Sequence, residues 1–428
     1  MRTEHHVRAL AGTPLVPIDD LLHDGALSCV YQPLIDLDSG AAVGHEALLR
    51  GPAGSPWESP LVLLDAARAV GRLSDLERCS LQAALHDATR LPPRGSRTLF
   101  VNIEPSTLTG HLDVVVEALS RRDSTQVVVE ITERALAADP AGVLAGAERL
   151  RAAGCAIALD DVGVEPESLA FIPLLRPEVV KLDLALLRSI EDPATLTVAG
   201  AVRAYAEASG AEVVAEGIET PEDLTRALVL GATLGQGWLW GRPARAFTQT
   251  ADARPRFVPH PVRGGSRTEP STLVAGRTDL RRAPKHLLLP LSHSLELVAR
   301  QSRVPPVLLA CFQDSRYFTR ATAGRYSALA ASLPFVGALG VGMPRVPVVG
   351  VHGTSLAADD PLAREWTVVV LGAHESVALI AREAGPGRPP AGLGTADDRA
   401  REFDFVVTHD HALVTAAAQS LVGRLTAG

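Results

Sequence analysis

The chain has 428 residues, of which 46% are hydrophobic and 21% charged, and its formal net charge is −8. This length exceeds the roughly 250–300 residues at which a single hydrophobic core stops growing, so we expect at least two domains and exclude wholesale disorder. An acidic chain lacks the dense cationic face that binds a long nucleic-acid backbone, so we expect any nucleotide site to be local.

Cysteine usage and hydropathy indicate where such a chain works. The four cysteines lie far apart and form no Cys-x-x-Cys pair, which is typical of a reducing cytosol. The first 20 residues have no apolar core with a cleavage site, and no window offers about 18 uninterrupted apolar residues. We therefore expect a cytoplasmic protein with no membrane partner.

Composition divides the chain into four parts. Residues 251–285 are rich in proline, arginine and glycine and show almost no apolar periodicity, which indicates a linker. We expect a tail at 1–20, a packed domain at 21–250, this linker, and a second packed domain at 286–428.

The first packed segment alternates short apolar runs with helical stretches such as 141–153 and 195–209. The runs are too uniformly apolar for strands with one solvent-facing side, so they indicate parallel strands buried on both faces. Repeated strand–helix units favour an α/β fold, a TIM-type (β/α) barrel of parallel strands. The expected strands are residues 99–101, 127–129, 157–159, 179–180 and 213–215.

A polar residue of a catalytic type follows each of these runs. A single acid after a strand is usually a helix cap or a solvated loop residue, but five successive cases predict side chains that converge at one mouth of the barrel. They are Asn102, Glu130, Asp160 with Asp161, Lys181 and Glu216.

Several carboxylates and an amide at one mouth predict a divalent cation, because crowded like charges repel one another unless a cation neutralises them. Oxygen ligands suit Mg²⁺ or Mn²⁺, and the chain shows no His/Cys spacing typical of zinc. The adjacent pair Asp160-Asp161 is compatible with two ions, a layout used to hydrolyse phosphodiesters.

Lys181 is informative because 39 of the 41 basic residues are arginine and only Lys181 and Lys285 are lysine. A lysine at the end of a buried strand indicates a need for a compact ammonium. The structural alternative is a buried salt bridge to Asp183 or Glu216, and both interpretations place the same groups together.

These residues carry a resemblance to a known family. The run Gly44-His45-Glu46-Ala47-Leu48-Leu49-Arg50 resembles the signature of the EAL domain, the phosphodiesterase of bacterial cyclic di-GMP signalling. Further similar motifs follow in order over about 225 residues. They are Tyr31-Gln32-Pro33-Leu34-Ile35-Asp36, Phe100-Val101-Asn102-Ile103, Glu130-Ile131-Thr132-Glu133, Leu159-Asp160-Asp161-Val162-Gly163, Val180-Lys181-Leu182-Asp183, Val214-Ala215-Glu216-Gly217-Ile218-Glu219-Thr220 and Gly235-Gln236-Gly237-Trp238.

The resemblance implies that the chain hydrolyses cyclic di-GMP to its linear form with two Mg²⁺ or Mn²⁺ ions, and that it can form a homodimer through this domain. It also implies roles for individual residues. One metal ion would be bound by Glu46, Asn102, Glu130 and Asp160, and the other by Asp160 with Asp161. Catalysis would depend on Lys181, Glu216 and Gln236, and substrate would be bound by Gln32 and Arg50. The neighbouring loop and Lys181 would be supported by Glu133, Asp183 and Glu219, of which Asp183 would also lie on the substrate side.

The loop after Asp160-Asp161 departs from the family pattern. The family continues Phe-Gly-Thr-Gly-Tyr-Ser-Ser-Leu, whereas residues 162–169 read Val-Gly-Val-Glu-Pro-Glu-Ser-Leu. The loop keeps its length and its final Ser-Leu but loses the flexible second glycine and the aromatic residue after it. It gains two carboxylates and a proline that stiffens the backbone. An alternative function is therefore a weak or inactive cyclic di-GMP receptor.

The second packed segment predicts a smaller α/β or α+β domain. We expect strands at 306–312, 346–351, 367–371 and 403–408, and helices at 319–332 and the C-terminus. The segment resembles a DICT sensory module through Phe312-Gln313-Asp314, Arg325-Tyr326, Glu365-Trp366 and Phe403-Asp404-Phe405. The sequence does not identify its signal. A third interpretation is a scaffold whose C-terminal domain binds the physiological ligand.

Overall fold

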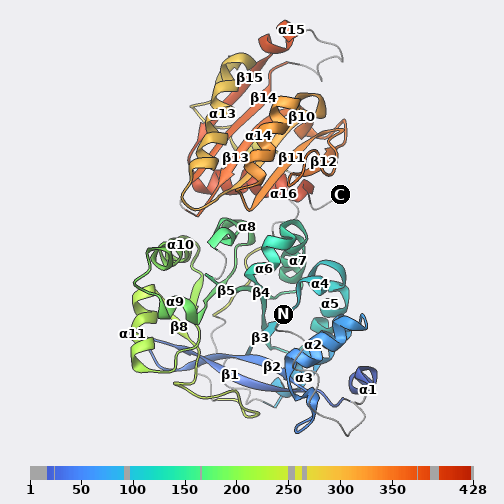
Figure 1. The fold of residues 1–428 in the computed structure, drawn as a ribbon, viewed down its shortest axis with the longest axis vertical. Helices are drawn as coiled ribbons and strands as arrows, with labels where there is room; N and C mark the ends of the chain where they lie inside the picture. The colour runs from blue at the N-terminus through green and yellow to red at the C-terminus, as the bar shows by residue number, and fades with distance from the viewer. Residues whose placement is uncertain are drawn as a thin grey trace, which may run out of the picture.

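The computed structural model describes residues 17–23, 25–90, 97–163, 166–248, 256–262, 268–373, 375–385 and 395–425. These residues form a barrel and, beside it, a separate sheet with its own helices (Figure 1). Within the described ranges, every helix is too short or too polar to cross a membrane.

The first part is a closed barrel of eight strands in chain order, which confirms the expected TIM-type fold. One feature differs from the expectation of parallel strands throughout: β1 runs antiparallel to both β2 and β8. A short hairpin joins β1 to β2, with Gly40 at φ +70°, and a hairpin necessarily reverses the chain. The strands are β1 (Ser28–Asp36), β2 (Ala42–Arg50), β3 (Thr98–Asn102), β4 (Gln126–Thr132), β5 (Ala156–Val162), β6 (Val179–Leu182), β7 (Glu212–Ala215) and β8 (Leu234–Gly235).

Helices surround the barrel, and their ends follow the capping chemistry of the sequence. Asp139 accepts the backbone N–H of Gly142 at the start of α7, and Thr220 with Asp223 forms a capping box on α11. α7 and α10 confirm the helices expected at 141–153 and 195–209. The helices are α1 (Ile18–His23), η1 (Pro56–Glu58), α2 (Pro60–Ala69), α3 (Leu73–Ala88), α4 (Pro105–Gly110), α5 (Leu112–Ser120), α6 (Glu133–Ala138), α7 (Pro140–Ala152), η2 (Pro166–Phe171), α8 (Ile172–Leu175), α9 (Leu184–Arg188), α10 (Pro193–Ser209) and α11 (Pro221–Leu230).

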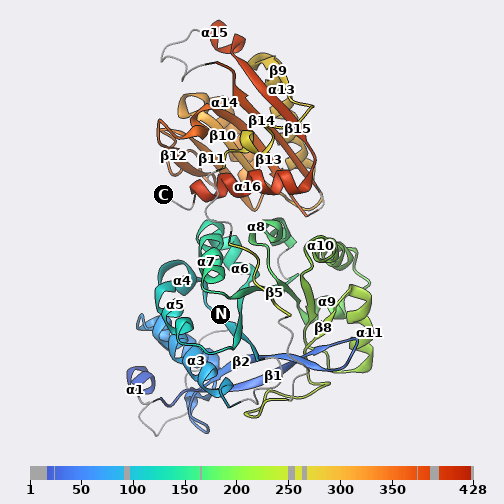
Figure 2. The ribbon, with the colours of Figure 1, turned by 180° about the vertical axis from the view of Figure 1, so that it is seen from behind.

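The second part is a seven-stranded sheet in the order β12-β11-β10-β13-β14-β15-β9. Its two faces are covered by different helices, α13 and α14 on one side and α16 on the other (Figure 1, Figure 2). The elements are α12 (Pro270–Leu273), β9 (Arg281–Pro284), α13 (Lys285–Gln301), β10 (Val307–Asp314), η3 (Ser315–Tyr317), α14 (Arg320–Ala330), β11 (Phe335–Val341), β12 (His352–Leu356), η4 (Pro361–Arg364), β13 (Glu365–Leu371), β14 (Ser376–Glu383), α15 (Thr395–Ala400), β15 (Glu402–Thr408) and α16 (His411–Leu425).

Most of the secondary structure expected for this part is confirmed, but the strand expected at 346–351 is wrong. These residues form turns between β11 and β12, and Val346 and Val349 are 66% and 83% exposed. Pro344 and Pro347 lack the N–H that a strand ladder needs, which explains why this apolar run does not pair.

The segment expected to be a linker contains packed residues. Residues 251–255 and 263–267 lie outside the described ranges, as do 1–16 of the expected tail, and the domain boundaries stay predictions. Between them, Phe257 is 2% exposed and meets Phe100 inside the barrel at a centroid distance of 5.2 Å. Further along, α12 packs against α16 and β9 completes one edge of the sheet.

The two parts share one hydrophobic core. Helix α16 packs against the sheet and also against α7 and α8 of the barrel (Figure 2). Phe171 and Phe335 meet across this interface with ring centroids 6.3 Å apart, and Gln419 donates to the carbonyl of Pro173 at 3.4 Å. The apolar cluster that fills the barrel wall therefore continues into the sheet.

Candidate active site

Lys181 on β6 lies at the centre of the predicted mouth and is 1% exposed. Its Nζ lies 2.6 Å from Glu130 Oε1, 2.6 Å from Glu216 Oε1, 3.2 Å from Asp160 Oδ1 and 3.7 Å from Glu46 Oε2. These four carboxylates come from β4, the end of β7, β5 and β2, so parallel strand ends do bring them together. We call Lys181 and these four residues the lysine cluster.

Three amide side chains join the lysine cluster on the side of β1 and β2. Asn102 Nδ2 donates to Glu46 Oε1 at 3.0 Å, and Gln236 Nε2 donates to Glu46 Oε2 at 2.6 Å. Gln236 also donates to Gln32 Oε1 at 3.2 Å, and Gln32 in turn donates to the Gly241 carbonyl at 3.4 Å. Both oxygens of Glu46 are therefore held in place by amide donors.

The pair Asp160-Asp161 is oriented by an irregular backbone. Successive side chains on a regular strand point to opposite faces. Here the β5–β6 pairing shifts between Leu159 and Val162, and Asp161 adopts φ +57°, in the left-handed region. Carboxylate oxygens of Asp160, Asp161 and Glu216 consequently all lie within 4.8 Å of one another, a spacing at which they can bind a common ion.

Electrostatics in the lysine cluster follow from burying more acids than bases. Burial and the charge of Glu46 raise the pKa of Glu130 well above its ordinary value, although Lys181 opposes this. Burial, partly offset by Lys181, raises the pKa of Glu216 to about 8. Burial also disfavours ionised Glu46, but the Lys181 ammonium and the amide donors outweigh it and lower the Glu46 pKa. Burial would lower the pKa of Lys181, but the surrounding carboxylates raise it.

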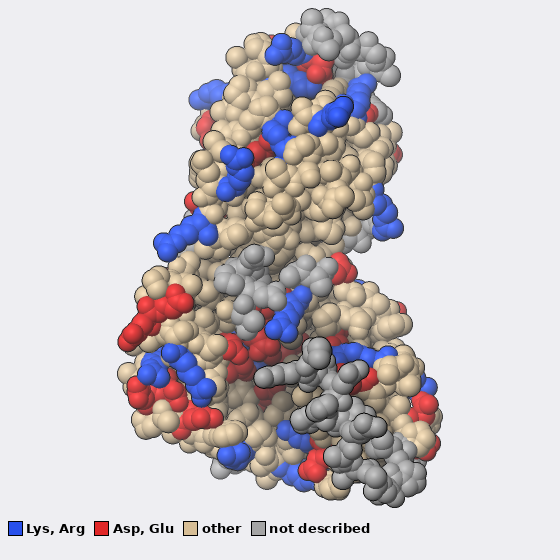
Figure 3. Space-filling view, viewed as in Figure 1, with Lys and Arg blue, Asp and Glu red and all other residues tan. Residues whose placement is uncertain are grey.

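These residues fit a divalent cation. Glu130 Oε2 and Gln236 Oε1 are buried and have no hydrogen-bond partner among the described residues, so a cation would supply the missing interaction. Burial and the neighbouring charge of Asp160 also raise the pKa of Asp161. The donors are all oxygens, the preference of Mg²⁺ and Mn²⁺. Acidic side chains are visible in the hollow at the centre of the barrel part in Figure 3.

The remaining predicted residues lie around this centre rather than in it. Glu133 is 1% exposed and accepts the Gly163 N–H at 3.2 Å, which anchors the loop after β5. Asp183 caps α9 by accepting the Ala185 N–H at 2.6 Å. Arg50 donates to its neighbour's carbonyl and lines a cavity of about 190 Å³ with Asn102.

Glu219 is the predicted residue that stands furthest from its expected role. It is exposed, and its carboxylate lies 3.9 Å from Arg188. The carboxylates that pair with Lys181 do not include Glu219 or Asp183. Of the two salt bridges weighed for Lys181, the structure has the one to Glu216.

Sequence reasoning overlooked Glu77. This side chain of α3 is 7% exposed, and its Oε1 accepts the Glu104 N–H at 2.5 Å, directly after the strand that carries Asn102. Burial raises the pKa of Glu77 to about 7. The sequence feature that could have identified Glu77 is its position on the apolar face of the helix, beside Leu73, Leu76 and Leu81.

The altered loop after β5 is only partly described. Val164 and Glu165 lie outside the described residues, so the prediction about the added carboxylates is not tested. The backbone resumes in η2 and runs directly into α8, which contacts the C-terminal part through α16. The loop therefore connects the Asp160-Asp161 pair to the interface between the two parts.

Two family models match the chain. The EAL domain model matches residues 17–243, which is more than half of the chain. A second model, described as a sensory domain in diguanylate cyclases and two-component systems (DICT), matches residues 272–384. The two matches correspond to the barrel and to most of the seven-stranded sheet.

Curated relatives match the barrel part. The cyclic di-GMP phosphodiesterase RocR of Pseudomonas aeruginosa is 29% identical over 245 residues, covering 52% of this chain and 58% of RocR. The cyclic di-GMP phosphodiesterase NbdA of the same species is 31% identical over 239 residues, covering 52% of this chain and 29% of NbdA. The matches thus span less than two thirds of either relative.

A similar solved structure is that of BlrP1 from Klebsiella pneumoniae in complex with manganese and cyclic di-GMP at pH 6. It matches with a TM-score of 0.47 and 27% identity, and the match covers 53% of this chain and 58% of BlrP1. Taken with the eight-stranded barrel and the ordered motifs from Gln32 to Gln236, the match to the family model shows that the chain belongs to the EAL domain family and carries a C-terminal DICT domain.

Proposed function

We propose that this chain is a metal-dependent phosphodiesterase that opens cyclic di-GMP to linear pGpG and is regulated by its DICT domain. The observation that carries the proposal is the lysine cluster, in which four carboxylates from four strands surround one buried ammonium. The names of RocR and NbdA support the choice of substrate.

The proposed metal ligands are the oxygen donors of the mouth. Glu46, Asn102, Glu130 and Asp160 would hold one Mg²⁺ or Mn²⁺ ion, and Asp160 with Asp161 would hold the second. Such ions acidify a coordinated water and neutralise charge that develops on phosphoryl oxygens. The unpartnered oxygens Glu130 Oε2 and Gln236 Oε1 support this assignment.

The chain's own side chains would position the water and move its proton. Glu216 Oε1 would accept the proton of the attacking water, and Lys181 Nζ, 2.6 Å away, would hold that carboxylate in place. The water oxygen would bond to phosphorus as the bond from phosphorus to the 3′ oxygen breaks. The leaving oxygen would take up a proton from solvent, and Glu216 would release its proton to solvent. Arg50 would bind a phosphate and Gln32 a guanine edge.

Turnover of cyclic di-GMP by the purified full chain tests the proposal. In Mg²⁺ or Mn²⁺, chromatography should show pGpG, whereas Lys181→Ala and Glu46→Ala should reduce the rate at least about 100-fold. Lys285→Ala is the matched control, because it removes the other lysine, which pairs with Asp398 in the DICT domain. No product in either metal would overturn the proposal.

A cyclic di-GMP receptor without turnover is the second candidate. It is favoured by the loop at 162–169, which keeps Gly163 but lacks the second glycine of the family pattern and the aromatic residue after it. Calorimetric binding of cyclic di-GMP by wild-type protein that forms no pGpG would identify this function. The contact from the Gly163 N–H to Glu133 favours the enzyme, because it anchors the start of the loop beside Asp160 and Asp161.

A further inference from the structure

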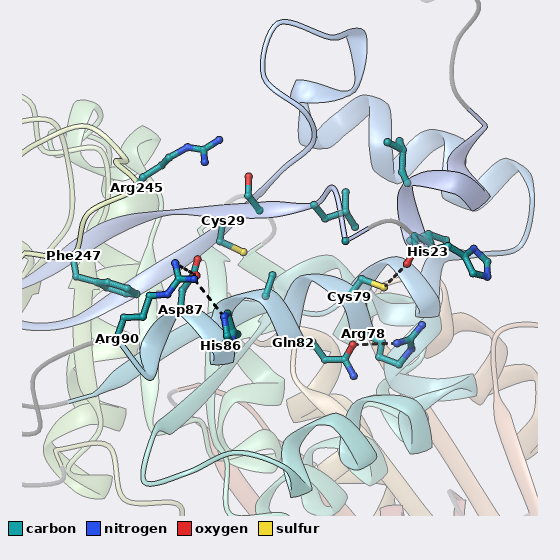
Figure 4. Close-up of a pocket in the computed structure, with 16 residues that line it drawn as sticks. His23, Cys29, Arg78, Cys79, Gln82, His86, Asp87, Arg90, Arg245 and Phe247 are labelled. Atoms are coloured by element: carbon teal, nitrogen blue, oxygen red, sulfur yellow. Dashed lines mark hydrogen bonds and ion pairs between the residues drawn. The ribbon is translucent and has the colours of Figure 1, made fainter.

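A second cavity lies on the outer side of β1, behind the strand from the lysine cluster. It has a volume of about 680 Å³ and is bounded by α1, the start of β1, α3 and the segment around Arg245 (Figure 4). This volume lies within the range of about 300–1,000 Å³ typical of small-molecule sites. We call it the β1 cavity.

The lining of the β1 cavity is cationic although the whole chain is acidic. Three arginines, Arg78, Arg90 and Arg245, line it, and Asp87 is the only acid among its described lining residues. Asp87 already accepts the Tyr31 hydroxyl at 2.9 Å and lies 3.4 Å from Arg90. Arg245 has no hydrogen bond or ion pair with any described residue, so its guanidinium is available to a ligand.

The wall that carries Arg245 is held against the barrel. Ala244 forms an isolated antiparallel bridge with Tyr31, with N–H to carbonyl distances of 2.7 and 3.0 Å. Phe247 stacks on Tyr31 at a centroid distance of 3.9 Å, and the Thr248 N–H donates to His45 Nε2 at 3.1 Å. The pocket wall is thus positioned before any ligand arrives, which lowers the entropic cost of binding.

Aromatic and cationic side chains line the same end of this cavity. Figure 4 shows Arg245, Arg90 and Phe247 toward one end of the cavity and His23, Cys79 and Arg78 toward the other. Cys29 lies between the two ends. Arginine's planar fork binds phosphate oxygens in pairs, and an aromatic face stacks on a nucleobase. Arg78 already pairs with Asp75 and Arg90 with Asp87, but an apolar ligand would leave Arg245 without a described partner. Inorganic phosphate alone would leave the aromatic and aliphatic lining unfilled.

We propose that the β1 cavity binds a nucleoside monophosphate, with its phosphate between Arg90 and Arg245 and its base against Phe247. The site is separate from the lysine cluster but adjoins the same strands. Tyr31 and His45 face Phe247 on the outer side, while their neighbours Gln32 and Glu46 face the mouth. The site does not depend on the proposed phosphodiesterase activity.

Isothermal titration calorimetry of the full chain in EDTA tests the site, because the chelator leaves the acidic mouth without the cations that would attract a phosphate. GMP and AMP are the nucleotide probes, and ribose 5-phosphate and guanosine are the partial ones. We expect one site for at least one nucleotide and at least tenfold weaker binding of both partial probes. Equal binding of ribose 5-phosphate, or no nucleotide binding at millimolar concentration, would overturn the proposal.

Substitutions in the lining test whether the nucleotide binds in the β1 cavity. Arg245→Ala and Arg90→Ala, both at exposed positions, should each weaken nucleotide binding at least tenfold. Phe247→Leu should weaken nucleotide binding but leave ribose 5-phosphate binding unchanged. Arg121→Ala is the control, since Arg121 is an exposed arginine paired with Glu117 on α5. Nucleotide binding that survives Arg245→Ala and Arg90→Ala unchanged would contradict the assignment.

Discussion

Lys181 shows how one residue organises the candidate site. A fully buried ammonium is expensive unless acids surround it, and here four carboxylates contact it. Burial, together with the neighbouring carboxylates, raises the pKa values of Glu130 and Glu216, and four acids around one base leave an excess of negative charge. The same excess is what makes the centre suited to divalent cations.

Glu46→Gln is expected to weaken Mn²⁺ binding at least about 100-fold, because loss of even an indirect partner of a metal ligand costs 10–100-fold. The new amide would also place a donor opposite the donors of Asn102 or Gln236, which now hold both Glu46 oxygens. Calorimetric titration of metal-free protein with Mn²⁺ measures the change. Glu212→Gln, at the opposite end of the barrel, should leave the affinity unchanged, and an equal loss in both variants would refute the assignment.

At the residue scale, strand ends could be read from the sequence, but contacts between side chains could not. Glu130, Asp160, Lys181 and Glu216 each follow a uniformly apolar run, so their convergence was predictable from the barrel alone. Glu46 and Gln236 required the family resemblance, because their strands are less uniform. The position of Glu219 beside Arg188 depends on the path of a loop that no periodicity encodes.

The ion pair between Arg151 and Glu178 ties helix α7 to the strands beneath it. Both side chains are buried, and Arg151 Nε donates to Glu178 Oε1 at 3.0 Å. Arg151 also donates to the Leu175 and Arg176 carbonyls, while Glu178 accepts the Ile157 N–H of β5 at 2.7 Å. This network joins one helix, one strand and the turn before β6.

Arg151→Ala is expected to lower the free energy of unfolding by about 3–5 kcal/mol, because it leaves a buried carboxylate without its cation. Arg149→Ala on the same helix is the control. Arg149 is half-exposed and pairs with Asp113, which is 91% exposed, so its loss should change stability by less than about 1 kcal/mol. Urea denaturation compares the two, and similar small effects would mean that the buried network contributes little.

Glu365 at the start of β13 makes stability depend on pH. It is fully buried and accepts hydrogen bonds from Ser271 of α12, and burial raises its pKa to about 7. Below its unfolded pKa both states bind the proton and the group has no effect. As pH rises towards 7, the unfolded chain releases the proton while the folded chain keeps it, so stability falls, and above 7 the loss is complete.

Glu365→Gln should therefore be more stable than wild type at pH 8, by about 1–3 kcal/mol, and lose this advantage near pH 4.5. The introduced amide would keep a carbonyl oxygen that can accept from Ser271. Unfolding midpoints measured from pH 4.5 to 8 give the difference, with the exposed Glu402→Gln as control. If the difference in unfolding midpoint between Glu365→Gln and wild type does not grow with pH, the raised pKa of Glu365 does not control stability.

At the scale of elements, the strands buried on both faces were the easiest to predict. Residues 99–101 and 127–129 have apolar neighbours on both sides, so a simple apolar run identified them. The same signal failed at 346–351, where valines lie between prolines and face solvent. The antiparallel β1 was missed because a hairpin direction depends on the turn and not on the strand composition.

The arrangement of the whole molecule was the part least accessible to sequence reasoning. Composition separated two packed segments correctly in outline, but α16 looked like an ordinary Ala-rich terminal helix. In the structure its buried residues include Val414, Ala417, Ala418 and Leu421, and the helix contacts the sheet on one side and α7 and α8 on the other. Small side chains permit both close approaches, and an apolar pattern does not identify the partner.

A core shared across α16 predicts that the barrel and the DICT domain unfold together. One apolar cluster contains barrel residues such as Phe171 and sheet residues such as Phe335, and residues in one packed cluster lose their contacts cooperatively. Scanning calorimetry of the full chain should show a single transition. Phe335→Ala, which removes the aromatic contact with Phe171 and leaves a cavity worth about 3–5 kcal/mol, should separate it into two.

Phe403→Ala is the matched control for this experiment, because Phe403 is equally buried but belongs to the cluster on the opposite face of the sheet, away from the barrel. That variant should lower the midpoint and keep one transition. Two transitions in the wild type would show that α16 does not couple the two parts, and the altered loop could then carry no signal from the DICT domain to the lysine cluster through this interface.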